Sequence, residues 1–302
     1  MLSIMLFHQY FTSLCPFNIF HNYGFWGVDI FLFLSGMGLV NSIEKNSLLT
    51  YYKHRYIRLV PSCLLCGITK YLIFIFLESS LFVLKDGLNL GIWSIASLDL
   101  WFIHTIIIFY IIAPFLYGII RRKPKIASFT IIVVFLLNGL FLSPIVGYKW
   151  MSLQGVISWS IERLPVFAAG MIMSTNIINI HHIKSTSVIF LIIAVALNSL
   201  EKTRFIFQGI KSFQILSLAM GMPAIIQLCI FILKKTPIHI KQLFIFLGTH
   251  SLELYLTHEF IFWSIKISFE DSNPIILLPI SFILSCFAAY LCKLCTNKLT
   301  KI

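Results

Sequence analysis

Charged side chains are scarce in this chain. Asp, Glu, Lys and Arg together make up 11% of its 302 residues, and only 11 residues are acidic. Hydrophobic residues make up 59%, and the mean hydropathy is +0.93. A water-soluble globule needs a far more polar surface than this composition can supply. The composition therefore excludes a soluble protein and indicates a membrane protein.

Linker-like segments are also lacking. The 10 Pro and 15 Gly residues form no Pro/Gly/Ser-rich stretch, no soluble-looking block interrupts the apolar segments, and no internal repeat is visible. Domain boundaries usually fall in such polar, flexible linkers. We therefore expect residues 1–302 to form one membrane domain.

The seven cysteines do not form a framework for disulfides or metal. Cys63 and Cys66, and likewise Cys292 and Cys295, have the spacing of metal or redox pairs. Both pairs lie in apolar segments, and no further Cys or His cluster stands near either pair in sequence to complete four ligands. We interpret these residues as small buried hydrophobes and predict no metal site.

Long apolar runs fill almost the whole chain. A helix needs about 20 mostly apolar residues to cross a bilayer. The sequence predicts an all-α, polytopic membrane bundle of about ten helices. The expected segments are 1–14, 24–43, 57–77, 98–120, 126–145, 153–175, 187–200, 209–233, 243–266 and 274–295. Because the first is too short to cross and has no cationic start, we expect part of it to lie upstream of Met1.

The cations fall mainly on one side of this layout. With the N-terminus inside, the inner connections and the C-terminus carry most of the Lys and Arg residues, as the positive-inside rule requires. Both termini are thus predicted to be cytoplasmic. Orientation and anionic lipid account for the net charge of +12, so no nucleic-acid partner is expected. The inner cations are Lys45, Lys53, Arg55, Arg58, Arg121, Arg122, Lys123, Lys125, Lys184, Lys234, Lys235, Lys241, Lys293, Lys298 and Lys301.

Several ionisable residues fall inside or at the rims of the predicted spans. Such groups are costly in lipid and usually face a cavity or a partner. Glu162 and Arg163 fit either a structural pair or a substrate-binding pair, and His258 fits either a buried core residue or the lining of a pocket. The full set is His8, Asp29, Asp99, His104, Glu162, Arg163, His250, Glu253, His258 and Glu259.

Arg55 and Arg58 lie three residues apart where a helix is expected to begin. Two guanidinium groups on one helix face can each fork onto phosphate oxygens, and free N–H groups at a helix start favour an anion further. A phosphate-bearing ligand arriving from the cytoplasm would meet this site first. The alternative is a plain basic loop that only orients the chain.

His8 and Asp29 lie on consecutive predicted helices, so they can share one cavity. A histidine can remove the proton of a hydroxyl, and a nearby carboxylate can orient the ring and stabilise its charged form. The spacing permits this catalytic pairing but does not decide whether the two side chains touch.

Five groups of residues resemble the membrane-bound acyltransferase 3 family in order and spacing, and the resemblance covers essentially the whole chain. They are the His8 run with Gly24-Phe25-Trp26-Gly27-Val28-Asp29-Ile30-Phe31-Leu32-Phe33-Leu34-Ser35-Gly36, Arg55-x-x-Arg58 with Pro61, Leu100-Trp101-Phe102 with Tyr110 and Pro114, Arg163-Leu164-Pro165-x-Phe167-x-x-Gly170, and Ser251-Leu252-x-x-Tyr255-Leu256-x-His258.

This resemblance implies an inner-membrane enzyme that moves an acyl group, commonly acetyl, from a cytoplasmic CoA thioester to a hydroxyl of a carbohydrate. His8 matches the catalytic His of the family. Arg55 and Arg58 match its Arg-x-x-Arg motif, which is taken to hold the CoA phosphates, and Asp29 falls in its Gly-Val-Asp signature. We expect Glu162, Arg163 and His258 to bind substrate. Direct transfer and a relay through an acylated His8 both fit the sequence.

One departure from the family pattern matters, and two alternative interpretations stay open. The family has an Arg ahead of the catalytic His, which here would fall upstream of Met1, so an inactive truncated copy is one alternative. A transporter or flippase of a lipid-linked sugar is the other. We expect the stand-alone form of the family, without the extracytoplasmic domain that some members carry. Rich in Phe, Ile and Lys, it is typical of an AT-rich bacterial gene, and by analogy we expect a surface polysaccharide or its lipid-linked precursor as acceptor.

Overall fold

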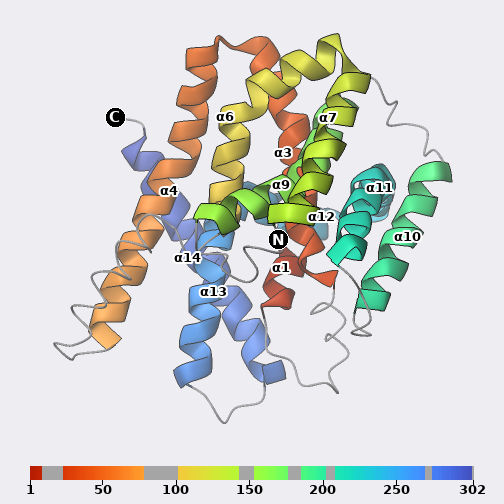
Figure 1. Ribbon diagram of the computed structural model, residues 1–302. Helices are drawn as coiled ribbons and strands as arrows, with labels where there is room; N and C mark the ends of the chain where they lie inside the picture. The colour runs from red at the N-terminus through yellow and green to blue at the C-terminus, as the bar shows by residue number, and fades with distance from the viewer. Residues whose placement is uncertain are drawn as a thin grey trace. The chain divides into compact units, whose positions relative to one another are not determined.

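The computed structural model describes residues 1–8, 23–77, 101–142, 153–175, 185–201, 208–268 and 274–300. Within these ranges the regular structure is helical (Figure 1). The elements are α1 (Leu2–Phe7), α3 (Trp26–Lys45), α4 (Leu48–Leu77), α6 (Trp101–Arg122), α7 (Pro124–Leu137), the π-helix η2 (Asn138–Leu142), α9 (Leu153–Ser174), α10 (Ser185–Glu201), α11 (Gln208–Lys235), α12 (Ile238–Thr249), α13 (Ser251–Ser268) and α14 (Pro274–Leu299).

The helices group into two compact units that alternate along the chain. Unit 1 comprises Met1–Val28, Lys53–Asp99 and Pro237–Ile302, and unit 2 comprises Asp29–Tyr52 and Leu100–Thr236. Helices α3 and α4 therefore each contribute to both units. The prediction of a single membrane domain over residues 1–302 stays a prediction.

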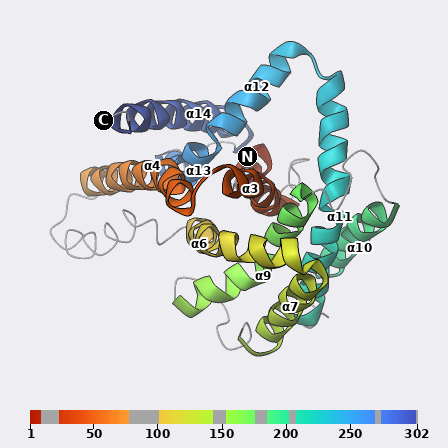
Figure 2. The same ribbon diagram turned by 90° about the horizontal axis from the view of Figure 1, so that it is seen from above.

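Unit 1 is built around α13. Helices α4, α13 and α14 lie side by side in it (Figure 2). A buried cluster joins α1, α12, α13 and α14 through Met5, Leu247, Leu254, Phe262 and Ala289. Because Met5 is part of this core, the short helix α1 is held against the longer helices despite its length.

Unit 2 contains a close crossing of α3 and α9. A Cβ atom added at Gly36 would run into the backbone of Phe167, and one added at Gly170 would run into the backbone of Phe33. Small residues at such positions allow two membrane helices to approach until their backbones touch. This close approach of the two backbones therefore explains why α3 has glycine at position 36 and α9 has glycine at position 170.

Buried polar pairs connect other helices of unit 2. Gln214 of α11 donates a hydrogen bond of 2.7 Å to Asn198 of α10, which lies beside it (Figure 1). Asn138 of η2 donates to the carbonyl of Ser158 on α9 at 3.1 Å. Hydrogen bonds of this kind fix the register of helices that an apolar surface alone would leave free to slide.

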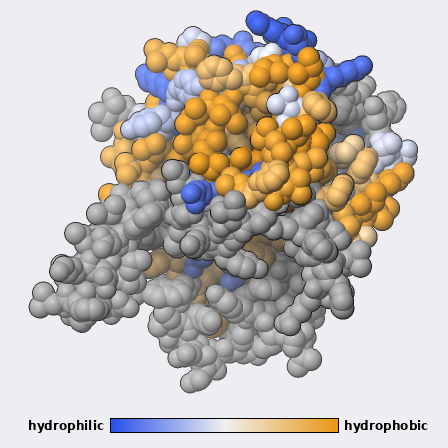
Figure 3. Space-filling model, viewed as in Figure 1, coloured by the Kyte–Doolittle hydropathy of each residue, from blue (hydrophilic) through white to orange (hydrophobic). Residues whose placement is uncertain are grey.

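Six helices of the described residues are long and apolar enough to cross a membrane. Their outward side chains are large and apolar; Phe115, Phe129 and Ile283, for example, are each more than 60% exposed. On the face seen in Figure 3, orange, hydrophobic side chains cover much of the described surface, and blue groups lie mainly toward its upper edge. The prediction of an all-α, polytopic membrane bundle is confirmed. The total of ten spans stays a prediction, because part of the chain lies outside the described residues.

Two predicted elements have different limits from those expected. The helix expected at 57–77 begins nine residues earlier, at Leu48, because no Gly or Pro interrupts residues 48–58 and Ser47 Oγ caps the first turn by accepting from the N–H of Thr50 at 3.3 Å. The span expected at 243–266 is interrupted at His250, where α12 ends and α13 begins. The outer loop expected near 78–97 lies outside the described residues.

Candidate active site on helix α13

His8 follows α1, and packing fixes its backbone. Its N–H donates to the carbonyl of Ile4 at 3.2 Å, closing the last turn of α1. Ser3 Oγ donates to the carbonyl of Gly24 at 3.2 Å, and a Cβ atom at Gly27 would lie 2.7 Å from Ile4 Cγ1. The contacts at Gly24 and Gly27 thus allow α1 to pack closely against the segment before Asp29, and this packing sets the position of His8.

The side chain of His8 contacts His258 of α13. The distance from His8 Nδ1 to His258 Nε2 is 2.9 Å, and the ring centroids lie 5.0 Å apart. His258 is completely buried, whereas His8 is half-buried. Of the two rings, His8 is the one that a substrate can reach.

Arg58 of α4 forms an ion pair with Glu253 of α13. Its Nη1 lies 3.1 Å from Glu253 Oε1, and Ser62 Oγ donates to the same oxygen at 3.1 Å. Glu253 is fully buried, so its carboxylate depends on these two donors, while 42% of the Arg58 side chain is exposed. The pair therefore anchors one edge of the guanidinium group and leaves the rest accessible.

The prediction that Arg55 and Arg58 stand at a helix start is wrong. Helix α4 begins at Leu48, so the N–H groups near both arginines are already used inside the helix. Pro61 adds a different feature, since it has no N–H to donate to the carbonyl of Ile57. An anion that bound here would meet side chains and not a helix terminus.

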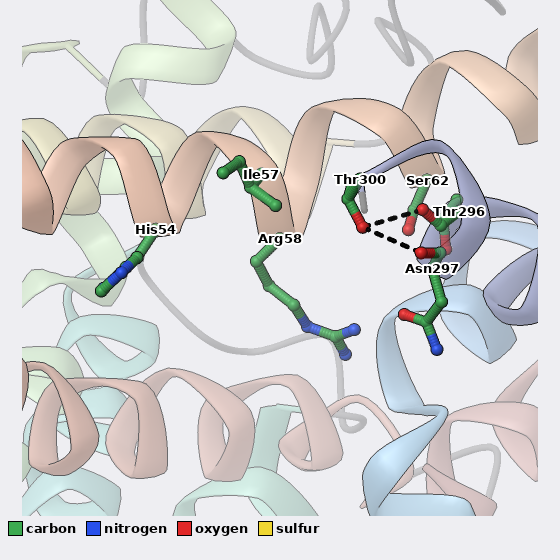
Figure 4. Close-up of a pocket in the computed structure, with 7 residues that line it drawn as sticks. All are labelled: His54, Ile57, Arg58, Ser62, Thr296, Asn297 and Thr300. Carbon is green, nitrogen blue, oxygen red and sulfur yellow. Dashed lines mark hydrogen bonds between the residues drawn. The ribbon is translucent and has the colours of Figure 1, made fainter. Parts of the chain in front are cut away.

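A cavity of about 200 Å³ opens beside Arg58. Figure 4 shows the Arg58 side chain extending from α4, with the polar residues of the last turns of α14 on the facing side. Thr300 Oγ1 donates to the carbonyls of Thr296 and Asn297 at 3.0 and 3.4 Å. The cavity is lined by His54, Ile57, Arg58, Ser62, Thr296, Asn297 and Thr300.

Arg163 and Asp29 form a second ion pair, in unit 2. Arg163 Nε of α9 lies 3.3 Å from Asp29 Oδ1 of α3, and both side chains are almost completely buried. The Trp101 ring lies 5.9 Å from Arg163 Cζ, within range of a cation–π contact. Glu162 is buried next to Arg163 in the chain. Asp29 and Gly36, like Arg163 and Gly170, are two helical turns apart, so the pair lies on the same faces as the glycine crossing.

The structure thus brings together some of the predicted site residues. His8 meets His258, and Arg163 meets Asp29. The catalytic pairing of His8 with Asp29 stays a prediction, since the two residues belong to different units. Arg55 is half-buried and does not line the cavity beside Arg58.

Four residues of this site carried no signal in the sequence. Ser62, Thr296, Asn297 and Thr300 are ordinary polar residues, and only the packing of α4 against α13 and α14 places them around Arg58. Glu253 did carry a signal, because an acidic residue in an apolar helix calls for a partner. Its sequence separation of 195 residues from Arg58 hid which partner that is.

The two Cys-x-x-Cys motifs contribute one residue each to a buried contact. Cys66 Sγ of α4 lies 3.1 Å from Cys292 Sγ of α14. Among the described residues, no group of three or more His, Cys, Asp or Glu side chains is placed to hold a metal ion. The thiols therefore serve here as contacts between α4 and α14.

Comparison with known proteins decides the family. A family model described as an acyltransferase domain, that of the acyltransferase 3 family, matches residues 1–294. The chain belongs to the acyltransferase 3 family. Neither the curated proteins nor the solved structures give a match. The geometry around α13 is therefore interpreted below as that of a multi-pass membrane acyltransferase.

Proposed function

We propose that this acyltransferase 3 family protein is an O-acetyltransferase of a bacterial inner membrane, with both termini in the cytoplasm. It transfers an acetyl group from cytoplasmic acetyl-CoA to a hydroxyl of a surface polysaccharide or of its lipid-linked precursor. The observation that carries the proposal is that one helix, α13, holds both His8, through His258, and Arg58, through Glu253. A base and an accessible cation are the two groups that transfer from a phosphate-bearing thioester requires.

His8 supplies the base. Its ring removes the proton of the acceptor hydroxyl while the hydroxyl oxygen attacks the carbonyl carbon of the thioester, and CoA leaves as a thiolate that takes up a proton. A two-step route, in which His8 is first acylated and then passes the acyl group to the hydroxyl, uses the same residue. In both routes the half-buried ring of His8 has to reach the reacting atoms.

Arg58 and the α14 side of its cavity supply the donor site. The exposed edge of the Arg58 guanidinium can fork onto a phosphate oxygen, and Asn297 and Thr296 add neutral polar groups on the facing helix. Glu253 keeps the guanidinium in place and offsets part of its charge. Arg55, half-buried three residues earlier on α4, is proposed to support the same phosphates.

Glu162 and Arg163 are proposed to serve the carbohydrate acceptor. Arg163 Nη1 is buried and donates no hydrogen bond to any described residue, which is costly for a charged group. A sugar hydroxyl would satisfy it, and the indole of Trp101 offers an apolar face to a sugar ring. Membrane lipid surrounds the exposed apolar helices, and no nucleic acid takes part.

Proton NMR of surface polysaccharide from the host tests the reaction. Four strains are compared: intact, deleted, and deleted but complemented with His8→Ala or His239→Ala, the last being an exposed histidine of α12. We expect the O-acetyl methyl signals to vanish in the deletion and in His8→Ala, and to persist in His239→Ala, since a general base contributes about 10²–10⁴-fold. Unchanged acetylation after deletion would overturn the proposal. If polysaccharide export failed at the same time, the transporter alternative would replace it.

The donor site is tested with inverted membrane vesicles supplied with ¹⁴C-labelled acetyl-CoA, counting label in the polysaccharide fraction. Arg58→Ala is compared with Lys53→Ala, which removes an exposed cation from the same helix. A lost charge-assisted contact of about 1.5–3 kcal/mol predicts a KM for acetyl-CoA roughly 10–100-fold higher in Arg58→Ala only. Equal effects of the two variants would show that α4 acts through general charge and not through Arg58.

A further inference from the structure

His258 has a hydrogen-bond geometry that fixes where its own proton lies. Its Nδ1 lies 2.9 Å from the carbonyl oxygen of Leu254 and 2.9 Å from that of Tyr255. Carbonyl oxygens only accept hydrogen bonds, so Nδ1 must carry the hydrogen. The ring is completely buried, and burying a charged imidazolium is costly, so the neutral ring is the resting form. The Nε2 of His258 therefore presents a lone pair.

This lone pair faces His8. His258 Nε2 lies 2.9 Å from His8 Nδ1, and a nitrogen with a lone pair can only accept in that contact. His8 Nδ1 is therefore the donor and carries a hydrogen. In the neutral His8 ring the lone pair then lies on Nε2, the nitrogen on the far side of the ring from His258.

We infer that His258 is a positioning residue, which sets the tautomer and the orientation of His8 so that Nε2 of His8 is the basic nitrogen. The inference rests on the proposed function, in which His8 removes the proton of the acceptor hydroxyl. A histidine here occupies the place that a carboxylate takes in catalytic triads, with a neutral acceptor instead of an anion. The helix backbone holds the partner, because both carbonyls that fix His258 belong to α13 itself.

A neutral partner suits a buried site. After His8 has taken up a proton, its Nδ1–H still donates to His258 Nε2, so the contact persists and directs the new positive charge toward an acceptor. Tyr255 and Phe262 pack their rings against His258, with centroids 5.8 and 5.7 Å away, and hold its ring plane. The direct contact assigns His258 to the base, whereas sequence alone placed it with the substrate-binding residues.

Two substitutions of similar size separate this role from packing. In His258→Gln the amide oxygen can replace Nε2 as acceptor, whereas in His258→Met no comparable acceptor remains. With ¹⁴C-labelled acetyl-CoA and inverted vesicles, we expect His258→Met to lower kcat by about 10²-fold or more, with KM for acetyl-CoA unchanged, and His258→Gln to recover most of it. Equal losses in both variants, or a change confined to KM, would overturn the inference.

A readout independent of activity keeps the two proposals apart. Protein labelled with ¹⁵N on histidine, in lipid nanodiscs, should show His8 protonated at Nδ1 and unprotonated at Nε2, with the signals assigned by their loss in His8→Gln. The reverse tautomer of His8 in the intact protein overturns the inference even if transfer proceeds. Absence of transfer by the intact protein, with the expected tautomer present, overturns the proposed function alone.

Discussion

Two ion pairs between described helices differ in what they leave accessible. Arg58 and Glu253 join α4 to α13, and 42% of the Arg58 side chain remains exposed beside a cavity. Arg163 and Asp29 join α9 to α3, and the side chains are 7% and 0% exposed. In the first pair only the carboxylate is buried, whereas in the second pair both side chains are buried.

This difference teaches how to interpret charge in a membrane helix. In a half-buried pair the exposed group remains accessible to a ligand, while the buried partner fixes its orientation. The main effect of a fully buried pair beside a glycine crossing is to hold two helices together, because separating the two charges would leave each of them unpaired in an apolar interior. Ionisable residues that look equivalent in sequence therefore differ in the loss of stability or activity that their substitution should cause.

The largest effect is expected at the glycine crossing of α3 and α9. In Gly36→Ala the new methyl group meets the backbone of Phe167, which cannot move aside as a flexible side chain could, so we expect loss of folded protein. Gly38→Ala is the matched control on the same helix, since nothing lies within 4 Å of its Cβ position. Fluorescence-detected gel filtration of both variants in mild detergent measures the difference. Equal yields of folded protein would show that the backbones are not in contact.

A smaller effect is expected from removing one partner of the buried ion pair of Arg163 and Asp29. Arg163→Met leaves the Asp29 carboxylate buried without its cation, which should cost about 3–5 kcal/mol of unfolding free energy. The double variant Asp29→Leu, Arg163→Met removes both charges and should recover most of that loss. Unfolding by SDS titration in mixed micelles measures both. If the double variant is as unstable as the single one, the pair does not account for the stability of the crossing.

The same double variant sharpens the comparison of the two pairs. If Arg163 also serves the acceptor, as proposed, the double variant regains stability but not transfer of label to polysaccharide. Recovery of both would leave Arg163 a purely structural residue.

The smallest effect is expected on the α14 side of the proposed donor cavity. Asn297→Ala removes one neutral polar group, worth about 1 kcal/mol, and should raise the KM for acetyl-CoA about five-fold without changing kcat. Cys295→Ala, an exposed neighbour on α14 that does not line the cavity, is the control. The vesicle assay with ¹⁴C-labelled acetyl-CoA measures both. An unchanged KM in Asn297→Ala would restrict the donor site to α4.

The sequence alone determined the class of the protein and the approximate place of its helices, because the membrane imposes a length and a composition on every span. It also singled out candidate site residues, such as His8 and Arg58, since ionisable groups stand out in apolar helices. The start of α4 was misjudged because residues 48–57 are more polar than a membrane span and yet continue the helix, and the break at His250 was missed because Gly248 and His250 stand in an otherwise apolar run.

Only the tertiary structure decided the partners. His8 meets His258 across 250 residues, and Arg58 meets Glu253 across 195. Periodicity and composition are local properties, and they cannot specify which of several apolar helices will pack together. The choice follows from close contacts such as those of Ile4 with Gly27 and of Phe33 with Gly170. These contacts set helix spacing and register, and thereby bring polar atoms that are far apart in the sequence within hydrogen-bonding distance.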